Sequence, residues 1–325
     1  MGIYIGSAGI PKTVSEIYIG INGQPREVTE GYIGVSGLPV QFYSSEVIIE
    51  NLPVGTLLRV PVATGYQSYL GAYINFKIAD QNHAGYPTNS TTLITDKIIA
   101  VLGFDAKEPN NTDNDRQNYG NNRYRYSNIS QWLNSNAAAG AWYTPQHSAD
   151  HEPSSTYVTY NPYSGRAGLL AMIDANFVSL LLNTSIVTVK NTVTDGGGTE
   201  SFISKMFLPS TTEVRLANEA GVEEGTLFPL FTTTNSSRYA YPTPECVSNS
   251  DYANASFNTS TVWHWRLRTP SSTTSQIPRH VNATGSLTQT NALVGFQGIR
   301  PVCNIQNTTL VDPTPNSDGS YNLII

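Results

Sequence analysis

Charged residues are scarce in this chain. Of its 325 residues only 13% are Asp, Glu, Lys or Arg, whereas a typical soluble domain carries about a quarter. Asn, Thr, Ser, Tyr and Gly fill the deficit. This polar but uncharged composition favours strands and long loops over the Glu-, Lys- and Ala-rich helices of a bundle. The composition therefore predicts a β-rich α+β fold.

Basic clusters, closely spaced cysteines and long apolar runs are missing as well. The formal net charge is −6, and no segment has the Lys and Arg density that neutralises phosphates, so we expect no nucleic-acid partner. Cys246 and Cys303 lack the spacing of a metal site, and the sequence leaves open whether they form a disulfide. No apolar run reaches the roughly 18 residues of a membrane span, so we expect no membrane insertion.

The N-terminus also lacks the basic start and apolar core of a secretory signal. A composition suited to a surface protein, without such a signal, is expected of a protein that leaves the cell by lysis inside an assembled particle. A cytosolic protein is compatible with the same features.

Residues 1–45 contain three copies of a 14-residue unit. Each has a Tyr-Ile-Gly core, then a second glycine and a proline, which predicts a short strand, a tight turn and an edge strand. Units this short need stacked neighbours or other chains to bury a core, so they predict a module for attachment or oligomerisation. A sheet packed on its own domain is the alternative. The candidate assembly residues are Tyr4, Gly6, Tyr18, Gly20, Tyr32 and Gly34.

Two or three helices are expected in the remaining chain. Ser127 can cap a first helix, in which Ile129, Trp132 and Leu133 share one face. A longer apolar stripe predicts a second helix over residues 167–183. The segment Ser210-Thr211-Thr212-Glu213 has the pattern of a capping box and predicts a short third helix.

Several segments together resemble a known family. The most specific are SNISQWLN at residues 127–134 and WRLRTP at residues 265–270, and the others fall at residues 74–78, 82–87, 104–108, 205–214 and 298–302. They resemble the DUF6273-type domain of bacterial and phage surface proteins, which is similar to the C-type-lectin-like fold of formylglycine-generating enzymes and phage receptor-binding proteins. The N-terminal units separately resemble YIGVNG-type repeats of phage tail-associated proteins.

The resemblance implies three parts and a role. Residues 1–45 form the β-repeat module, 46–305 the lectin-like domain, and 306–325 a tail or last strand. The implied protein is a bacteriophage tail fibre or receptor-binding protein, located in the virion and extracellular after lysis. Its implied partners are other virion proteins, a bacterial surface glycan or protein, and sister chains, with a trimer as the usual expectation for phage fibres. The alternatives are a decoration or head-fibre protein without its own ligand, and a glycan-acting enzyme.

Enzymatic chemistry finds little support in the motifs. The resembling enzymes use a reactive cysteine pair, and neither Cys246 nor Cys303 sits in a matching motif. His147 and His151 are four residues apart, but Pro145 and Pro153 bracket them in a loop-like segment, which argues against a helical zinc pair. We therefore expect a binding protein rather than an enzyme, although paired carboxylates of glycosidase type leave no spacing that a sequence could reveal.

The expected contact surface is rich in tyrosine and asparagine. Tyrosine and tryptophan supply rigid contact area and asparagine supplies adaptable hydrogen bonds, a combination that binds carbohydrates. The candidate ligand-binding residues are Tyr119, Tyr124, Trp142, Tyr143, Tyr157, Tyr160, Arg238 and Tyr239.

Calcium is the one cofactor that the sequence leaves open. One loop concentrates carboxylates among asparagines, and calcium prefers six to eight oxygen ligands. An ordinary solvated loop is the alternative. The weak calcium candidates are Asp105, Glu108, Asp113 and Asp115. Three arginines, Arg266, Arg268 and Arg300, are expected to tie loops together through buried hydrogen bonds, because one guanidinium can hold several carbonyl groups.

Overall fold

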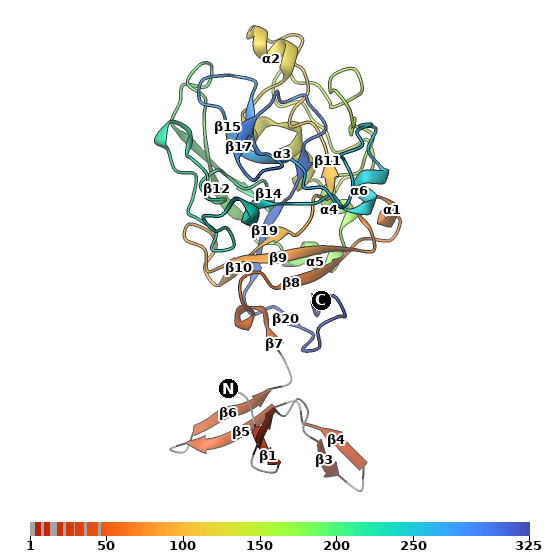
Figure 1. Ribbon diagram of the computed structural model, residues 1–325, viewed down its shortest axis with the longest axis vertical. Coiled ribbons are helices and arrows are strands. Elements are labelled where there is room, and N and C mark those ends of the chain that lie inside the picture. The colour runs from red at the N-terminus through yellow and green to blue at the C-terminus, as the bar shows by residue number, and fades with distance from the viewer. Residues whose placement is uncertain are drawn as a thin grey trace.

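The structure is a computed structural model that describes residues 4–7, 10–13, 18–21, 24–28, 30–35, 38–44 and 47–325 (Figure 1). The described part is a β-rich α+β fold, as the composition predicted, with six short α-helices and several sheets. No helix in this part of the chain is long and apolar enough to cross a membrane.

Three hairpins occupy the N-terminal repeats, each a separate two-stranded sheet. Their registers are equivalent, because Gly6, Gly20 and Gly34 each pair with the proline of their own unit. The expected turns lie outside the described residues. Tyr18 is exposed, whereas the side chains of the other assembly candidates lie outside the description. The strands are β1 (Tyr4–Ser7), β2 (Ile10–Thr13), β3 (Tyr18–Ile21), β4 (Gln24–Glu27), β5 (Glu30–Val35) and β6 (Leu38–Ser44).

A six-stranded sheet forms one layer of the body, in the order β14-β19-β10-β9-β8-β21. Its pairs are antiparallel except β21 with β8. β9 alternates exposed and buried side chains over Tyr73–Ile78, so one face packs on the core and the other stays polar. The strands are β8 (Leu57–Pro61), β9 (Tyr73–Gln81), β10 (Ser90–Thr95), β14 (Met206–Phe207), β19 (Val302–Gln306) and β21 (Tyr321–Asn322).

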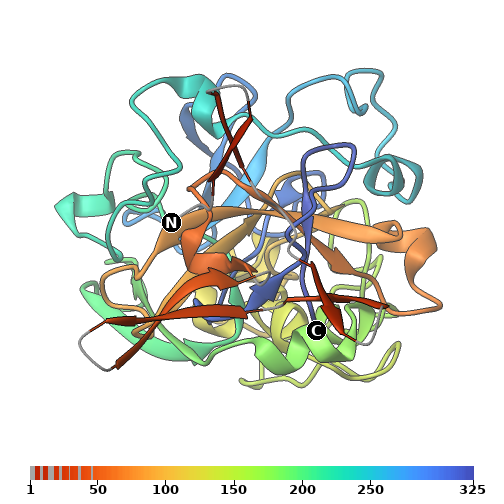
Figure 2. The ribbon, with the colours of Figure 1, turned by 90° about the horizontal axis from the view of Figure 1, so that it is seen from below.

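A second sheet of five strands has the order β11-β18-β15-β16-β17. The chain passes from β10 to β11 and from β18 to β19, so both passages connect the two sheets. Viewed from below, the body shows the strands crossing its middle with loops spread around them (Figure 2). The strands are β11 (Ala100–Val101), β15 (Trp265–Pro270), β16 (Pro278–Val281), β17 (Leu287–Gln289) and β18 (Gly298–Ile299).

The C-terminal segment 306–325 belongs to these sheets. Its β20 (Leu310–Val311) pairs with β7 (Val47–Ile48), which precedes the 3-10 helix η1 (Ile49–Asn51), and its β21 lies at the edge beside β8. A further hairpin consists of β12 (Thr184–Val189) and β13 (Thr199–Ser204), which flank a glycine-rich turn at residues 195–198.

The first expected helix is confirmed. α3 covers Asn128–Asn134, and the Ser127 hydroxyl accepts a hydrogen bond from the Ser130 amide. Trp132 is buried, and its indole donates to the Ala167 carbonyl at 2.9 Å. The predicted structural role of this apolar face is therefore observed.

The second expected helix is two helices. α4 (Leu169–Met172) and α5 (Ala175–Leu180) are separated by extended residues Ile173 and Asp174. The Met172 carbonyl accepts from the Ala63 amide, and the Asp174 amide donates to the Pro61 carbonyl. Pairing with the end of β8 breaks the helix, and apolar periodicity alone could not predict that competition.

The third expected helix is wrong, although its capping box forms. The Ser210 amide donates to the Glu213 carboxylate at 2.9 Å and the Glu213 amide to the Ser210 hydroxyl at 3.1 Å. Residues 211–215 make only a turn, which ends where Arg215 adopts a φ of +58°. The other helices are α1 (Gln67–Leu70), α2 (Asn114–Tyr119), α6 (Pro244–Ser248) and the 3-10 helices η2 (Tyr124–Tyr126), η3 (Glu219–Gly221) and η4 (Asn235–Arg238).

Buried arginines connect the layers, as expected. The Arg300 guanidinium donates twice to the Thr95 carbonyl, at 3.1 and 2.8 Å, and lies 4.7 Å from the Trp265 ring. It therefore pins both passages between the sheets. Cys246 and Cys303 are buried free thiols.

Candidate functional site

Two hollows are lined by residues in and near η2. Arg125 and Gln146 of the outer hollow are chain neighbours of Tyr126 and His147 of the inner one, and we call the two hollows together the polar groove. The inner hollow has a volume of about 180 Å³ and the outer one about 470 Å³. The inner lining is Glu108, Asn111, Arg116, Asn121, Arg123, Tyr126, His147 and Asp150. The outer lining is Arg125, Ser130, Gln131, Asn134, Thr144, Gln146, Phe202 and Ile203.

Tyr126 lines the inner hollow and directly follows Arg125, which lines the outer one. The guanidinium of Arg123 lies 4.6 Å from its ring centroid and that of Arg125 5.6 Å. The His147 ring meets the same tyrosine edge-on at 4.4 Å. Arg123 is fixed in turn by two 2.7 Å hydrogen bonds to the Glu200 carboxylate on β13. The tyrosine is thus held by cation–π and aromatic contacts before any ligand arrives.

The outer hollow combines apolar and polar groups. Ile203 is 63% exposed, and Phe202 lines the hollow beside it. Gln131 accepts a hydrogen bond from the Thr144 amide at 3.2 Å, while its own buried Nε2 has no partner among the described residues. A buried donor without a partner is unusual in folded proteins. The hollow therefore offers an apolar face and an unused amide donor close together.

Glu108 forms the acidic floor of the inner hollow, and the buried Asp105, which does not line the hollow, is linked to it through Asn121. The Asp105 carboxylate accepts from the amides of Asn128 (2.9 Å) and Asn121 (3.0 Å), and the Asn121 side chain donates to Glu108 at 3.1 Å. Burial raises the pKa of Asp105 well above its ordinary value, and the nearby Glu108 raises it further. Burial also raises the pKa of Glu108. Titratable groups perturbed in this way concentrate at functional sites.

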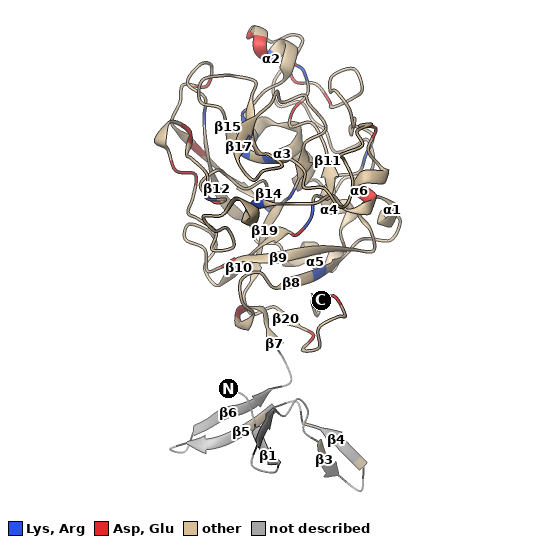
Figure 3. Ribbon diagram, viewed as in Figure 1, with Lys and Arg blue, Asp and Glu red and all other residues tan. Residues whose placement is uncertain are grey.

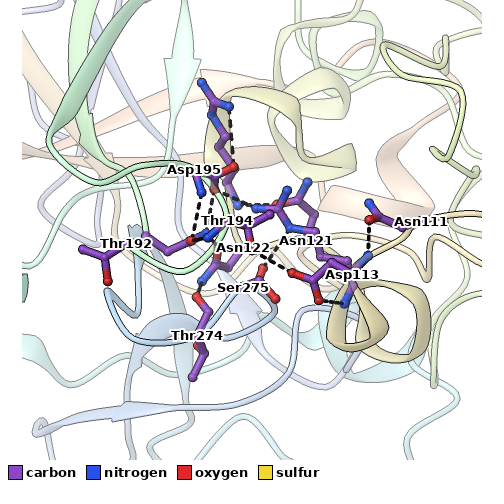
Figure 4. Close-up of polar contacts among 12 residues, drawn as sticks. Asn111, Asp113, Asn121, Asn122, Thr192, Thr194, Asp195, Thr274 and Ser275 are labelled. Carbon is purple, nitrogen blue, oxygen red and sulfur yellow. Dashed lines mark hydrogen bonds and ion pairs between the residues drawn. The ribbon is translucent and has the colours of Figure 1, made fainter.

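A hydrogen-bonded frame supports this floor (Figure 4). The Asp195 carboxylate accepts from Arg116 at 2.7 Å and from Asn191 at 2.6 Å. Asn191 also donates to Asn122 at 3.0 Å. These contacts tie the glycine-rich turn after β12 to the segment that lines the inner hollow, so the floor is held from outside the hollow.

The four calcium candidates do not converge. Asp105 and Glu108 are linked through Asn121, but Asp113 caps α2 and accepts from the Thr194 hydroxyl at 2.7 Å, while Asp115 is exposed. In the described residues no group of three or more His, Cys, Asp and Glu side chains has the arrangement of a metal site. His147 and His151 are likewise separate, since His147 contacts Tyr126 and His151 stacks on Tyr157.

Three of the eight candidate ligand-binding residues belong to the interior. Tyr124 is buried, and its hydroxyl accepts from the Leu208 amide at 3.0 Å. Trp142 is buried and stacks on Tyr163 with a centroid distance of 5.4 Å. The Arg238 guanidinium is buried and donates to the Gly285 carbonyl at 2.7 Å. Their burial corrects the expectation of surface contact.

The other five candidates are at least partly accessible. Tyr119, Tyr160 and Tyr239 are exposed, and Tyr143 and Tyr157 are half-buried. None of them lines the polar groove. Sequence reasoning did not single out the groove residues Arg125, Gln131, Phe202 and Ile203. The alternation of basic and aromatic residues at 123–126 was the available signal.

A comparison with protein families identifies the family of the chain. The family model described as a domain of unknown function, DUF6273, matches residues 89–307, a span that includes every residue of the polar groove. No curated protein and no solved structure matches the chain. The chain belongs to the DUF6273 family.

Proposed function

We propose that this chain is a bacteriophage virion protein that attaches the particle to glycans of the bacterial surface, and that the polar groove is the glycan-binding site. The composition of the outer hollow carries the proposal. A sugar ring has an apolar face and a rim of hydroxyls, and Phe202, Ile203, Arg125 and Gln131 offer matching surfaces. The C-type-lectin-like assignment and the virion location are parts of the proposal.

The N-terminal repeats support the virion half of the proposal. Three hairpins in equivalent register would present the same short strands three times, which suits docking on another virion protein or on sister chains. We propose that these hairpins attach the chain and that the DUF6273 domain faces the host.

Binding of the full chain to an array of purified bacterial surface polysaccharides and peptidoglycan fragments tests the groove. The double variant Arg125→Ala, Gln131→Ala should lose at least about tenfold in affinity, as is typical when central contacts are removed. Ser201→Ala, an exposed change on the same strand as Ile203, is the matched control and should bind as the parent does. Equal binding by the double variant would contradict the groove assignment.

Gold-antibody labelling of purified particles tests the location. Label at the distal tail is the expected result. Label over the head or collar would indicate a decoration or head-fibre protein instead, and intact particles without label would contradict the virion proposal.

Glycan hydrolysis is a second candidate function, favoured by one observation. Glu108, whose pKa burial raises, lines the inner hollow together with Asp150, and glycosidases pair a protonated carboxyl with an ionised one. Release of sugar fragments that Glu108→Gln abolishes, with binding retained, would support it. Binding without any fragment release would leave attachment as the function.

A further inference from the structure

A separate hollow of about 250 Å³ lies between the polar face of β8 and β9 and the short helices α1 and α6. Figures 1 and 2 show these two helices side by side at one edge of the body. None of its lining residues belongs to the polar groove. Six of them carry the argument that follows: Arg59, Tyr73, Asn75, Lys97, Glu245 and Asp318.

The sheet presents an aromatic ring to this hollow. Tyr73 is 51% exposed, although it lies on a strand whose alternate residues are buried. The Arg59 guanidinium lies 5.1 Å from the ring centroid and is held by a 3.0 Å ion pair with Asp318. Arg59 covers one face of the ring. With half of the side chain still accessible, the ring can stack on a ligand.

The polar groups around the ring have unused capacity. The buried Asn75 Oδ1 has no hydrogen-bond partner among the described residues, and a buried acceptor left unpaired costs free energy. Neither the Lys97 ammonium nor the Glu245 carboxylate forms an ion pair in the described part of the chain. Gly71 makes room for that carboxylate, because a Cβ there would lie 3.3 Å from it. A donor, an acceptor and a residue with an unpaired amide oxygen therefore line the same hollow as this aromatic ring.

We infer that this hollow is a second carbohydrate site, which takes a single uncharged saccharide ring stacked on Tyr73, with its hydroxyls shared among Asn75, Lys97 and Glu245. Charges of both signs on the rim favour hydroxyls, which donate and accept, over a phosphate, which Glu245 and Asp318 would repel. The inference shares its ligand class with the proposed function but none of its residues. Two sites on one chain would raise avidity for a polymeric glycan.

Saturation-transfer NMR on the full chain tests the site, with glucose, galactose, rhamnose and N-acetylglucosamine as probes at millimolar concentration. We expect transfer to the ring protons of at least one sugar and a loss of at least about tenfold in affinity for Tyr73→Ala and Glu245→Gln. Tyr119→Ala removes another exposed tyrosine, one that is 40% exposed and does not line the hollow, and it should leave the signal unchanged. Because Tyr73 and Glu245 are not core residues, matching thermal unfolding curves will show that these variants are folded.

The outcomes separate this inference from the proposed function. The double variant Arg125→Ala, Gln131→Ala should keep the monosaccharide signal, because it alters only the polar groove. No signal with any of the four sugars, or a signal that survives Tyr73→Ala, overturns the second site. Array binding that depends on the polar groove is scored independently, so either proposal can fail while the other stands.

Discussion

At the scale of single residues, three arginines of this charge-poor chain lie in the interior and hold it together. Arg266, Arg268 and Arg300 are all buried. Burial lowers the pKa of Arg266 to about 9 and that of Arg300 to about 10. Arg268 differs: burial lowers its pKa, but Glu213, Tyr86 and Glu224 together outweigh burial, so the pKa is raised. Burial lowers the pKa of a guanidinium that has only carbonyl partners. A guanidinium with a carboxylate partner also has a counter-charge, which stabilises its charged form.

Replacing Arg268 should be strongly destabilising. Its guanidinium makes two 2.7 Å hydrogen bonds to Glu213 and others to the Leu208 and Glu224 carbonyls. Arg268→Met would leave a buried carboxylate without its counter-charge, which costs about 3–5 kcal/mol. Urea unfolding of the full chain measures the loss.

Two further variants serve as controls for the stability loss of Arg268→Met. The double variant Arg268→Met, Glu213→Leu should recover part of the stability, because the Glu213 carboxylate is then no longer buried without its counter-charge. Arg125→Ala, an exposed arginine, should change the free energy of unfolding by no more than about 0.5 kcal/mol. A loss at Arg268 no greater than that at Arg125 would mean that the buried pair is not a major source of stability.

At the scale of elements, the helices are short and depend on their first residues. Thr243 caps α6 and accepts from the Cys246 amide, while Asp174 caps α5 and accepts from the Asn176 amide at 2.9 Å. α5 positions Phe177 against Phe76 of the six-stranded sheet, with a distance of 5.8 Å between the ring centroids. With so few turns, a helix of this kind has little stability of its own and relies on its cap and its packing.

Removing the cap of α5 should be measurable. Asp174→Ala leaves the Asn176 amide without its partner and should lower the free energy of unfolding by about 1 kcal/mol, whereas Asp174→Asn keeps a capping oxygen and should cost much less. Chemical denaturation of the two variants side by side measures the difference. Equal losses would indicate that the charge of Asp174, rather than its cap, is what matters.

At the scale of the whole molecule, the described charges are scattered rather than gathered (Figure 3). The hairpins of the repeats form sheets of their own. Within the body, the C-terminal strands pair with its first strands, β20 with β7 and β21 with β8. Folding of the body and assembly by the repeats are therefore expected to be separable.

Deleting residues 1–45 should leave the thermal midpoint of the body unchanged, because the core residues that the structure describes all lie beyond them. The same deletion should abolish oligomerisation if the repeats carry it. Light scattering after size-exclusion chromatography compares the molar mass of the two chains. A truncated chain that keeps the oligomeric mass of the full chain would place the oligomer interface in the body instead.

The sequence by itself determined the class of fold and the first helix with its Ser127 cap. Each of these depends on neighbours within a few residues, where periodicity and capping are decided. It also identified Arg266, Arg268 and Arg300 as internal ties, because their charge in apolar segments needs partners. The break at Ile173 and Asp174 escaped prediction, since a strand more than a hundred residues away competes for the same backbone groups.

Only the tertiary structure decided which polar residues share a surface. Arg125, Gln131 and Ile203 lie on three separate elements, and Tyr73, Lys97 and Glu245 lie on a strand, a loop and a helix. In the sequence, Tyr124 and Trp142 have polar neighbours like those of the exposed tyrosines, but in the structure both side chains are packed in the interior. Composition records how many aromatic and polar groups a chain has. Which of them face solvent together depends on long-range contacts between sheets and loops, and local sequence carries no record of these.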